Sequence, residues 1–138
     1  MAVTRRMLGE VEQARDLDES ALKLLTEVLG AEHPRTLVCA VNLASDLAAL
    51  GDTRGSLELN RRTLASLERV LGDQHSTTLA CALNYAIDLR RSEDGTEAEA
   101  LFANAVAGYR QVLGDAHPAT ISATQSIRAN CDIYPIPV

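Results

Sequence analysis

The chain is poor in aromatic residues, and its formal net charge is negative. It has no Trp, and its 138 residues include only three Tyr and one Phe. The hydrophobic core must therefore be aliphatic, built from Leu, Val and Ala. The net charge of −6 argues against nucleic acid as a partner, because a nucleic-acid-binding surface needs clustered Lys and Arg.

Features of membrane insertion and secretion are also lacking. The chain has no apolar run of about 18 residues, the length that a membrane-spanning helix requires. Arg5 and Arg6 are followed by no apolar stretch, so we expect no signal peptide. There are only three cysteines, and Cys39 and Cys81 are typical of small buried residues in a reducing compartment. These absences predict a single cytoplasmic domain that neither enters nor spans a membrane.

An internal repeat of 42 residues dominates what is present. Leu-Gly pairs recur at Gly30, Gly72 and Gly114, and the register extends beyond them. The aligned sets include His33, His75 and His117; Thr36, Thr78 and Thr120; and Asn42 with Asn84. A fixed period of this size is typical of stacked supersecondary units, which bury their apolar faces only against their neighbours. The repeat therefore favours a binding function over catalysis.

Two amphipathic helices are expected in each unit. Apolar residues recur every three or four positions over 35–50 and 54–71, and again over 77–91 and 96–113. We call the helix that opens a unit first-type and the helix that closes it second-type. Gly residues stop these helices, because Gly readily adopts the left-handed conformation. Residues 10–29 match a second-type helix, so the chain opens in mid-unit.

The resulting prediction is an all-α fold of about six helices, arranged as a right-handed superhelical stack without β-strands. It forms one domain over residues 1–138. The predicted parts are a partial repeat (1–29), two repeats (30–71 and 72–113), a final helix (114–131) and an extended tail (132–138). Pro118 suits the start of the final helix, and Pro135 and Pro137 favour an extended tail.

The helix-turn-helix unit resembles the tetratricopeptide repeat (TPR). Gly51-Asp52 in the turn and small residues at Ala14, Ser56 and Ala98 carry this resemblance. The 42-residue period, with Gly-x-x-His-Pro leading to Thr-Leu, is similar to the kinesin-light-chain-like type of repeat. Ser76 departs from the pattern, because a Pro is expected there.

A narrower resemblance concerns the residues around two of the helices. Leu17-Asp18-Glu19 and the Asn-x-Ala-x-Asp-Leu pattern over 84–89 are similar to the repeat region of actinobacterial STAND (NB-ARC-type) ATPase/TPR proteins. The chain itself has no Gly-x-x-x-x-Gly-Lys motif of an ATPase.

No catalytic residue, metal site or cofactor is predicted. Stacked repeats separate the equivalent histidines by about twice the 8–10 Å interaxial distance, and one ion with bonds of about 2 Å does not span that gap. We expect the histidines to pack in the inter-helix loops. Cys39 and Cys81 are too far apart for a disulfide. Asp73, His75 and Ser76 are sequence neighbours that do not converge as a hydrolase triad.

The resemblance implies that first-type helices line a concave groove that binds a peptide or a partner protein. Helical periodicity places these residues on it: Val41, Asn42, Ser45, Leu83, Asn84, Ile87, Arg90, Arg91 and Ser126. The resemblance implies that Asn42 and Asn84 hold the ligand backbone, since an amide both donates and accepts. The alternative is that they bond neighbouring helices. Arg90 and Arg91 would attract a carboxylate, or would simply be solvated.

Two functions stay open. The first is a non-enzymatic protein–protein interaction module, and the second is a ligand-sensing, regulatory repeat fragment of a larger STAND-type ATPase. Residues 1–8 supply only about two turns of cover, so apolar residues of the first expected helix should be exposed. They are Leu17, Leu22, Leu25 and Val28. An exposed patch of this kind predicts a homodimer through one end of the stack.

Overall fold

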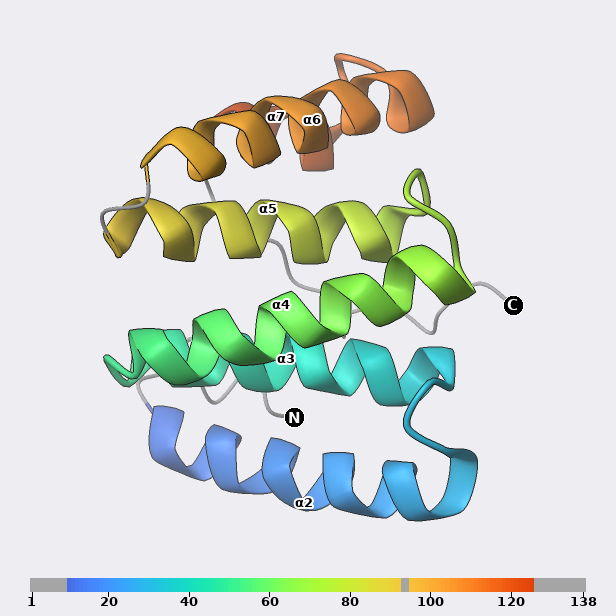
Figure 1. Cartoon of the computed structure of the whole chain (residues 1–138), viewed down its shortest axis with the longest axis vertical. Coiled ribbons are helices and arrows are strands. Elements are labelled where there is room, and N and C mark those ends of the chain that lie inside the picture. Colours follow the sequence, from blue (N-terminus) through green and yellow to red (C-terminus); the bar gives the residue numbers. More distant parts are fainter. Residues whose placement is uncertain (1–9, 93–94, 126–138) are drawn as a thin grey trace.

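The computed structural model of the chain describes residues 10–92 and 95–125, and six helices stack on one another within those ranges. The first-type helices are α3 (Pro34–Ala49), α5 (Ser76–Arg91) and α7 (Pro118–Thr124). The second-type helices are α2 (Val11–Leu29), α4 (Thr53–Val70) and α6 (Gly95–Leu113). The two types alternate along the stack (Figure 1).

The predicted all-α repeat fold is confirmed, and the described ranges contain no strand. The bounds expected for α2 to α6 agree with the structure within one residue. The final helix was expected over 114–131. The structure begins it at Pro118 and follows it to Thr124, while Ser126 and the tail lie outside the described residues.

The repeated histidine stands directly before each first-type helix and caps it. The histidine Nδ1 accepts a hydrogen bond from the backbone N–H two residues later, a group that has no partner inside the helix. These bonds join His33 to Arg35 (3.1 Å), His75 to Thr77 (3.1 Å) and His117 to Ala119 (3.0 Å). The sequence predicted only loop packing for these residues, and the cap gives the physical reason for their recurrence.

Glycines in the left-handed region end the helices, as predicted. Gly30, Gly72 and Gly114 follow the second-type helices with φ of 97°, 88° and 88°, and Gly51 follows α3 with φ of 87°. A side chain at these points would be strained, which explains why glycine marks the repeat.

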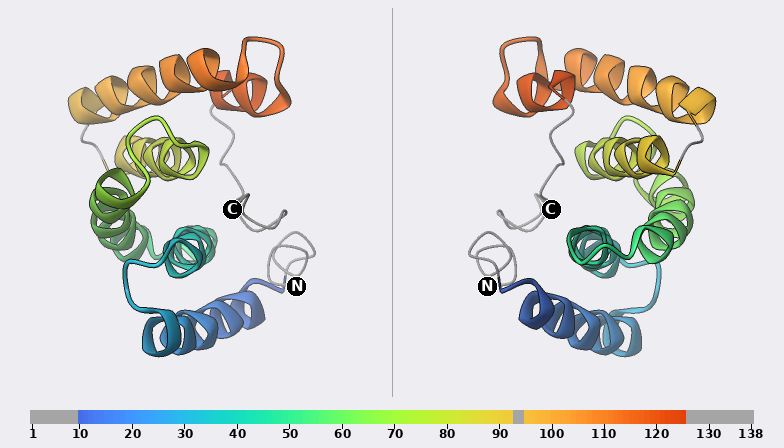
Figure 2. Two further views of the ribbon diagram at one scale, coloured as in Figure 1. Left: turned by 90° about the vertical axis from the view of Figure 1, so that its right-hand side faces the viewer. Right: turned by 90° about the vertical axis from the view of Figure 1, so that its left-hand side faces the viewer.

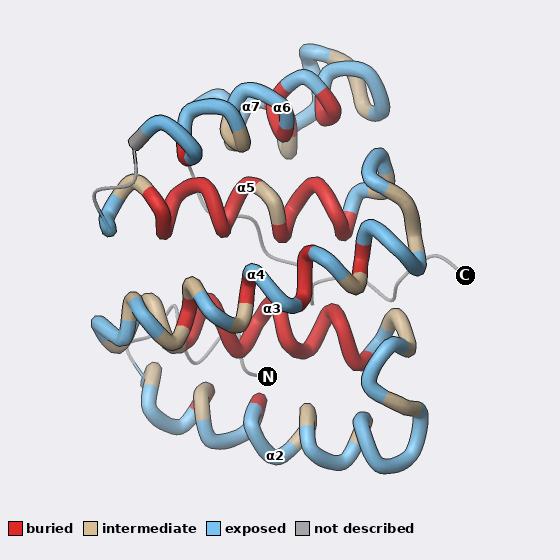
Figure 3. Tube along the Cα trace, viewed as in Figure 1, coloured by how far each residue is buried: buried red, intermediate tan, exposed pale blue. Residues whose placement is uncertain are grey.

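The core is centred on the first-type helices α3 and α5, which are buried along most of their length (Figure 3). It is mainly aliphatic, as expected, and also contains Cys81 and two buried tyrosines. One cluster contains Leu37, Val41, Leu64, Leu67, Cys81, Tyr85, Leu89 and Ala98. The other contains Leu79, Leu83, Ile87, Ala105, Val106, Tyr109 and Ala123. Burial therefore joins α3 to α6 in one cluster and α5 to α7 in the other.

The stack is curved, and the two helix types lie on different sides of the curve. Figure 2 shows α3, α5 and α7 on the inner side and α2, α4 and α6 on the outer side. The inner side is therefore where the sequence predicted a binding surface.

Candidate functional site on the concave side

Three apolar residues of the predicted groove lie in the hydrophobic core. Val41 belongs to the cluster around Leu67, while Leu83 and Ile87 belong to the cluster around Tyr109. The reason is that α3 packs against both α2 and α4, and α5 against both α4 and α6. Because each inner helix packs against two others, it buries residues beyond its main apolar face. A role of these three side chains in ligand contact stays a prediction.

Three polar residues of the predicted groove are buried too. Asn42 and Ser45 lie on α3, and Asn84 on α5 is 0% exposed. Each of the three has an interaction partner within the protein. This environment agrees with the alternative in which the asparagines bond neighbouring helices. Direct contact with a ligand would require their present neighbours to move.

Arg90 is held by the next helix. Its Nε lies 2.8 Å from Oε1 of Glu99 and its Nη2 lies 3.3 Å from Oε2, which is a two-pronged ion pair with α6. The guanidinium carbon also lies 4.1 Å from the centroid of the Phe102 ring, within cation–π distance. Arg91, the next residue, is exposed. Of the two arginines, Arg91 is therefore the one open to an anionic ligand.

A buried polar cluster joins α4 to α5, and the sequence analysis missed it. The carboxylate of Asp88, which is 0% exposed, accepts hydrogen bonds from the Ser56 hydroxyl and, at 2.9 Å, from the Asn60 amide. The Cys81 thiol lies 3.6 Å from the Asn60 carbonyl oxygen. The available signal was the repeat itself, because Asp18, Asp46 and Cys39 stand one unit before Asn60, Asp88 and Cys81.

In that earlier unit the joint between α2 and α3 has a different composition. Asp18 and Asp46 occupy the positions of Asn60 and Asp88, and both carboxyls are buried. The Cys39 thiol donates to the Asp18 carbonyl oxygen at 3.5 Å. Burial, reinforced by the negative charges of Asp18 and Asp46, raises the pKa of Cys39 to about 12. This thiol is therefore neutral at physiological pH and is a poor nucleophile.

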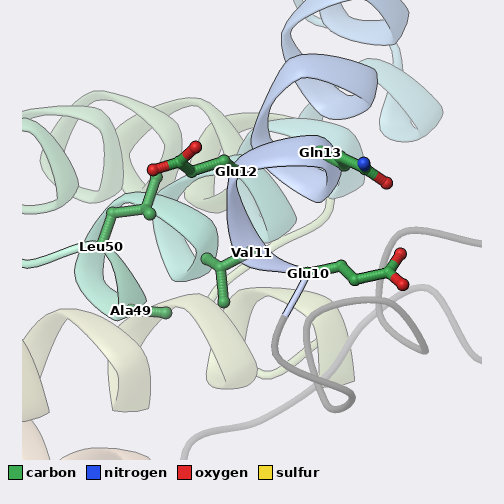
Figure 4. Close-up of a pocket in the computed structure, with 6 residues that line it drawn as sticks. All are labelled: Glu10, Val11, Glu12, Gln13, Ala49 and Leu50. Carbon is green, nitrogen blue, oxygen red and sulfur yellow. The ribbon is translucent and has the colours of Figure 1, made fainter.

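Two small hollows lie between neighbouring helices. Each has a volume of about 360 Å³. The first lies between the start of α2 and the end of α3 and is lined by Glu10, Val11, Glu12, Gln13, Ala49 and Leu50 (Figure 4). The polar side chains among these six residues are Glu10, Glu12 and Gln13. The second lies between α4, α5 and α6, near Leu79 and Gly108.

Metal ligation and membrane insertion have no support in the described part of the chain. Within residues 10–92 and 95–125, no three side chains of His, Cys, Asp or Glu are placed to hold a metal ion. None of the helices in these ranges is long and apolar enough to cross a membrane.

Stacked helix pairs, each with a capped first helix, define an α-helical repeat protein. Sequence comparison identifies the repeat: models of the tetratricopeptide repeat match residues 1–69 and 78–119. The chain belongs to the tetratricopeptide repeat family. Such repeats are generally protein–protein interaction modules and typically non-enzymatic scaffolds. No curated protein matches the chain.

Solved structures show which TPR proteins the chain is similar to. The kinesin light chain nearly identical TPR-like repeats of Podosopora anserina share 25% identity with it, at a TM-score of 0.83 over 91% of the chain. BtubC (BKLC) from P. vanneervenii shares 21% identity, at a TM-score of 0.77 over 91% of the chain, which is a likeness of fold. The chain spans 60% of the first structure's length and 49% of the second's. The predicted similarity to kinesin-light-chain-like repeats is confirmed, while the similarity to STAND ATPases stays a prediction.

Proposed function

We propose that the chain is a non-enzymatic interaction module whose concave side receives a peptide or an extended segment of a partner protein. One observation carries the proposal: in a chain of the TPR family, the first-type helices lie together on the inner side of a curved stack (Figure 2). The proposed contacts remain Val41, Asn42, Ser45, Leu83, Asn84, Ile87, Arg90, Arg91 and Ser126.

These residues divide into two groups in the proposal. Arg91 is exposed on α5 and meets a carboxylate of the ligand directly. The buried asparagines Asn42 and Asn84 contact the ligand backbone only after the inner face rearranges. Arg90 contributes by fixing the end of α5 to α6 through Glu99 and Phe102.

The experiment selects peptides from a displayed library on the purified chain and measures their affinity by fluorescence anisotropy. Arg91→Ala should weaken binding of an acidic peptide several-fold. Arg62→Ala removes an exposed arginine from the outer helix α4 and should leave the affinity unchanged. Asn84→Ala is measured together with its unfolding midpoint. A loss of affinity at an unchanged midpoint supports ligand contact, whereas a fall in the midpoint alone supports a structural role.

The titration is repeated with a version of the chain that ends at Cys131. The predicted tail over 132–138 is extended by its prolines and would compete with a peptide for the same face. Equal affinity in both versions, with no loss in Arg91→Ala or Asn84→Ala, would mean that the concave side is not the binding surface.

The proposal also covers the partners of the protein and its self-association. We propose that the chain has no nucleic-acid partner, since its net charge is −6. A cytoplasmic location without a membrane partner stays a prediction. We also propose self-association through an end of the stack, because Leu17 and Val28 of α2 are exposed.

The alternative, a regulatory repeat fragment of a STAND-type ATPase, stays a prediction. The mass of the native protein separates the two, because the chain alone has a mass of 14.8 kDa.

A further inference from the structure

An exposed apolar stripe runs along α2. Leu17, Leu24 and Val28 are 46%, 59% and 68% exposed, and Ala21 lies between the first two. The spacing of four, three and four residues puts all four side chains on one helix face. The stripe contains no charged residue. A contiguous apolar surface of this kind marks a contact site.

The repeat shows what covers the same stripe in the other second-type helices. Gly108 of α6 stands at the repeat position of Leu24, and it is buried against α5. A Cβ atom added to Gly108 would lie 2.4 Å from a methyl carbon of Leu79. In α4 the equivalent of Leu24 is Ser66, which is half-buried, whereas Val70 and Val112, the equivalents of Val28, are 40% and 45% exposed. In α6, a leucine of the preceding first-type helix therefore covers the Leu24 position of the stripe.

The opposite end of the stack exposes the matching residue. Ile121 of α7 stands at the repeat position of Leu37 and Leu79, which are both buried, yet Ile121 is 45% exposed. The described part of α7 packs chiefly against α6, whereas α3 and α5 each lie between two second-type helices. Residues 118–125 carry no charged side chain, so an uncharged face would meet an uncharged stripe. The α2 and α7 helices lie at opposite ends of the molecule (Figure 1).

We infer that α7 of one copy docks on α2 of a second copy, head to tail. Ile121 then packs on the Leu24 stripe from the side on which Leu79 packs on Gly108, with the two helices farther apart because Leu24 is larger than Gly108. The stack continues from one copy into the next. This inference rests on the self-association proposed above and is independent of peptide binding on the concave side. Such an interface joins two different surfaces, so it does not close at two copies and grows with concentration.

Sedimentation over a broad range of concentration tests the inference. The average mass of the unmodified chain should rise steadily above 14.8 kDa. Leu24→Glu and Ile121→Glu should each remain at the mass of one chain, because each variant loses one of the two surfaces. An equimolar mixture of the two should form a complex of two chains, because α7 of the first variant and α2 of the second are both intact.

Control variants separate the interface from general effects. Val70→Glu changes an apolar residue of α4 that is 40% exposed in the middle of the stack, and it should associate like the unmodified chain. Circular dichroism checks folding. Leu24→Ser, which introduces the side chain that α4 has at Ser66, replaces Leu24→Glu if that variant unfolds.

The two proposals fail in different ways. An unmodified chain that remains at 14.8 kDa at the highest concentration overturns both self-association and its head-to-tail form. A chain that associates while the mixed variants form no complex, or while Ile121→Glu still associates alone, overturns only the head-to-tail form. Neither result bears on peptide binding, which the titration measures separately.

Discussion

At the residue scale, the repeated histidine acts as a helix cap. Its Nδ1 accepts a backbone hydrogen bond at the start of α3, α5 and α7, with distances of 3.0 to 3.1 Å. An acceptor nitrogen carries no proton, so the bond selects the tautomer with its proton on Nε2. The recurrence of histidine at this spacing therefore has a structural cause in each unit by itself, and needs no metal or catalysis.

Replacing the central cap should destabilise the fold. His75→Ala removes the acceptor of the Thr77 N–H and should lower the free energy of unfolding by about 0.5–2 kcal/mol. His75→Asn should retain most of the stability, because Asn is among the best capping residues. Urea denaturation measures both variants. Equal losses in the two would show that the cap contributes nothing and that the imidazole matters for another contact.

The buried thiol of Cys39 should make stability depend on alkaline pH. Its pKa is raised to about 12 in the folded chain, above the value of about 8.5 for an exposed thiol, so the folded state retains the proton longer. The resulting stabilisation is complete below about pH 8.5 and is lost as the pH rises towards 12. Cys39→Ala, which introduces the residue that α7 has at Ala123, should reduce the decline in unfolding free energy above about pH 9. An identical decline in both proteins would contradict this linkage.

At the scale of helices, the sequence was informative where structure depends on local pattern. The spacing of apolar residues and the glycine stops predicted α2 to α6 within one residue, because both act within a few residues of chain. Burial of single side chains depends instead on helices distant in sequence. Val41 was expected on the inner surface and lies in the core, because α3 is contacted from two sides. Asn60 lies on a second-type helix, and only its bond to Asp88 shows its role.

The joint between α4 and α5 should depend on Asp88. Asp88→Ala leaves the Ser56 hydroxyl and the Asn60 amide without this acceptor and should cost about 1–3 kcal/mol of unfolding free energy. Ser56→Ala is a mild change, because Ala14 and Ala98 occupy the same repeat position. The double variant should therefore lose less than the sum of the two single variants, with a coupling of about 0.5–3 kcal/mol. Additive losses in chemical denaturation would show that Ser56 and Asp88 do not interact.

At the scale of the whole molecule, the proposed activities use separate surfaces. Peptide binding is assigned to the inner side of the curve, where the first-type helices lie (Figure 2), with Arg91 of α5 as a proposed exposed contact. Self-association is assigned to the two ends, where Leu24 and Ile121 are exposed. A copy held at its ends would still present its inner side, so a head-to-tail assembly would repeat the binding surface along its length and bind repeated ligands with increased avidity.

Added salt should change self-association and peptide binding in opposite directions. Each copy has a net charge of −6, so copies repel one another at low ionic strength while the Leu24–Ile121 contact is uncharged. Added salt shortens the screening length to about 8–10 Å near 0.1 M, so sedimentation at rising salt should show stronger self-association. The same salt should weaken the binding of an acidic peptide to Arg91, because attraction between opposite charges is screened too. Parallel sedimentation and titration of one preparation at low and high salt measure both trends. Self-association that weakens with salt would mean that ion pairs join the copies, and the apolar ends would not be the interface.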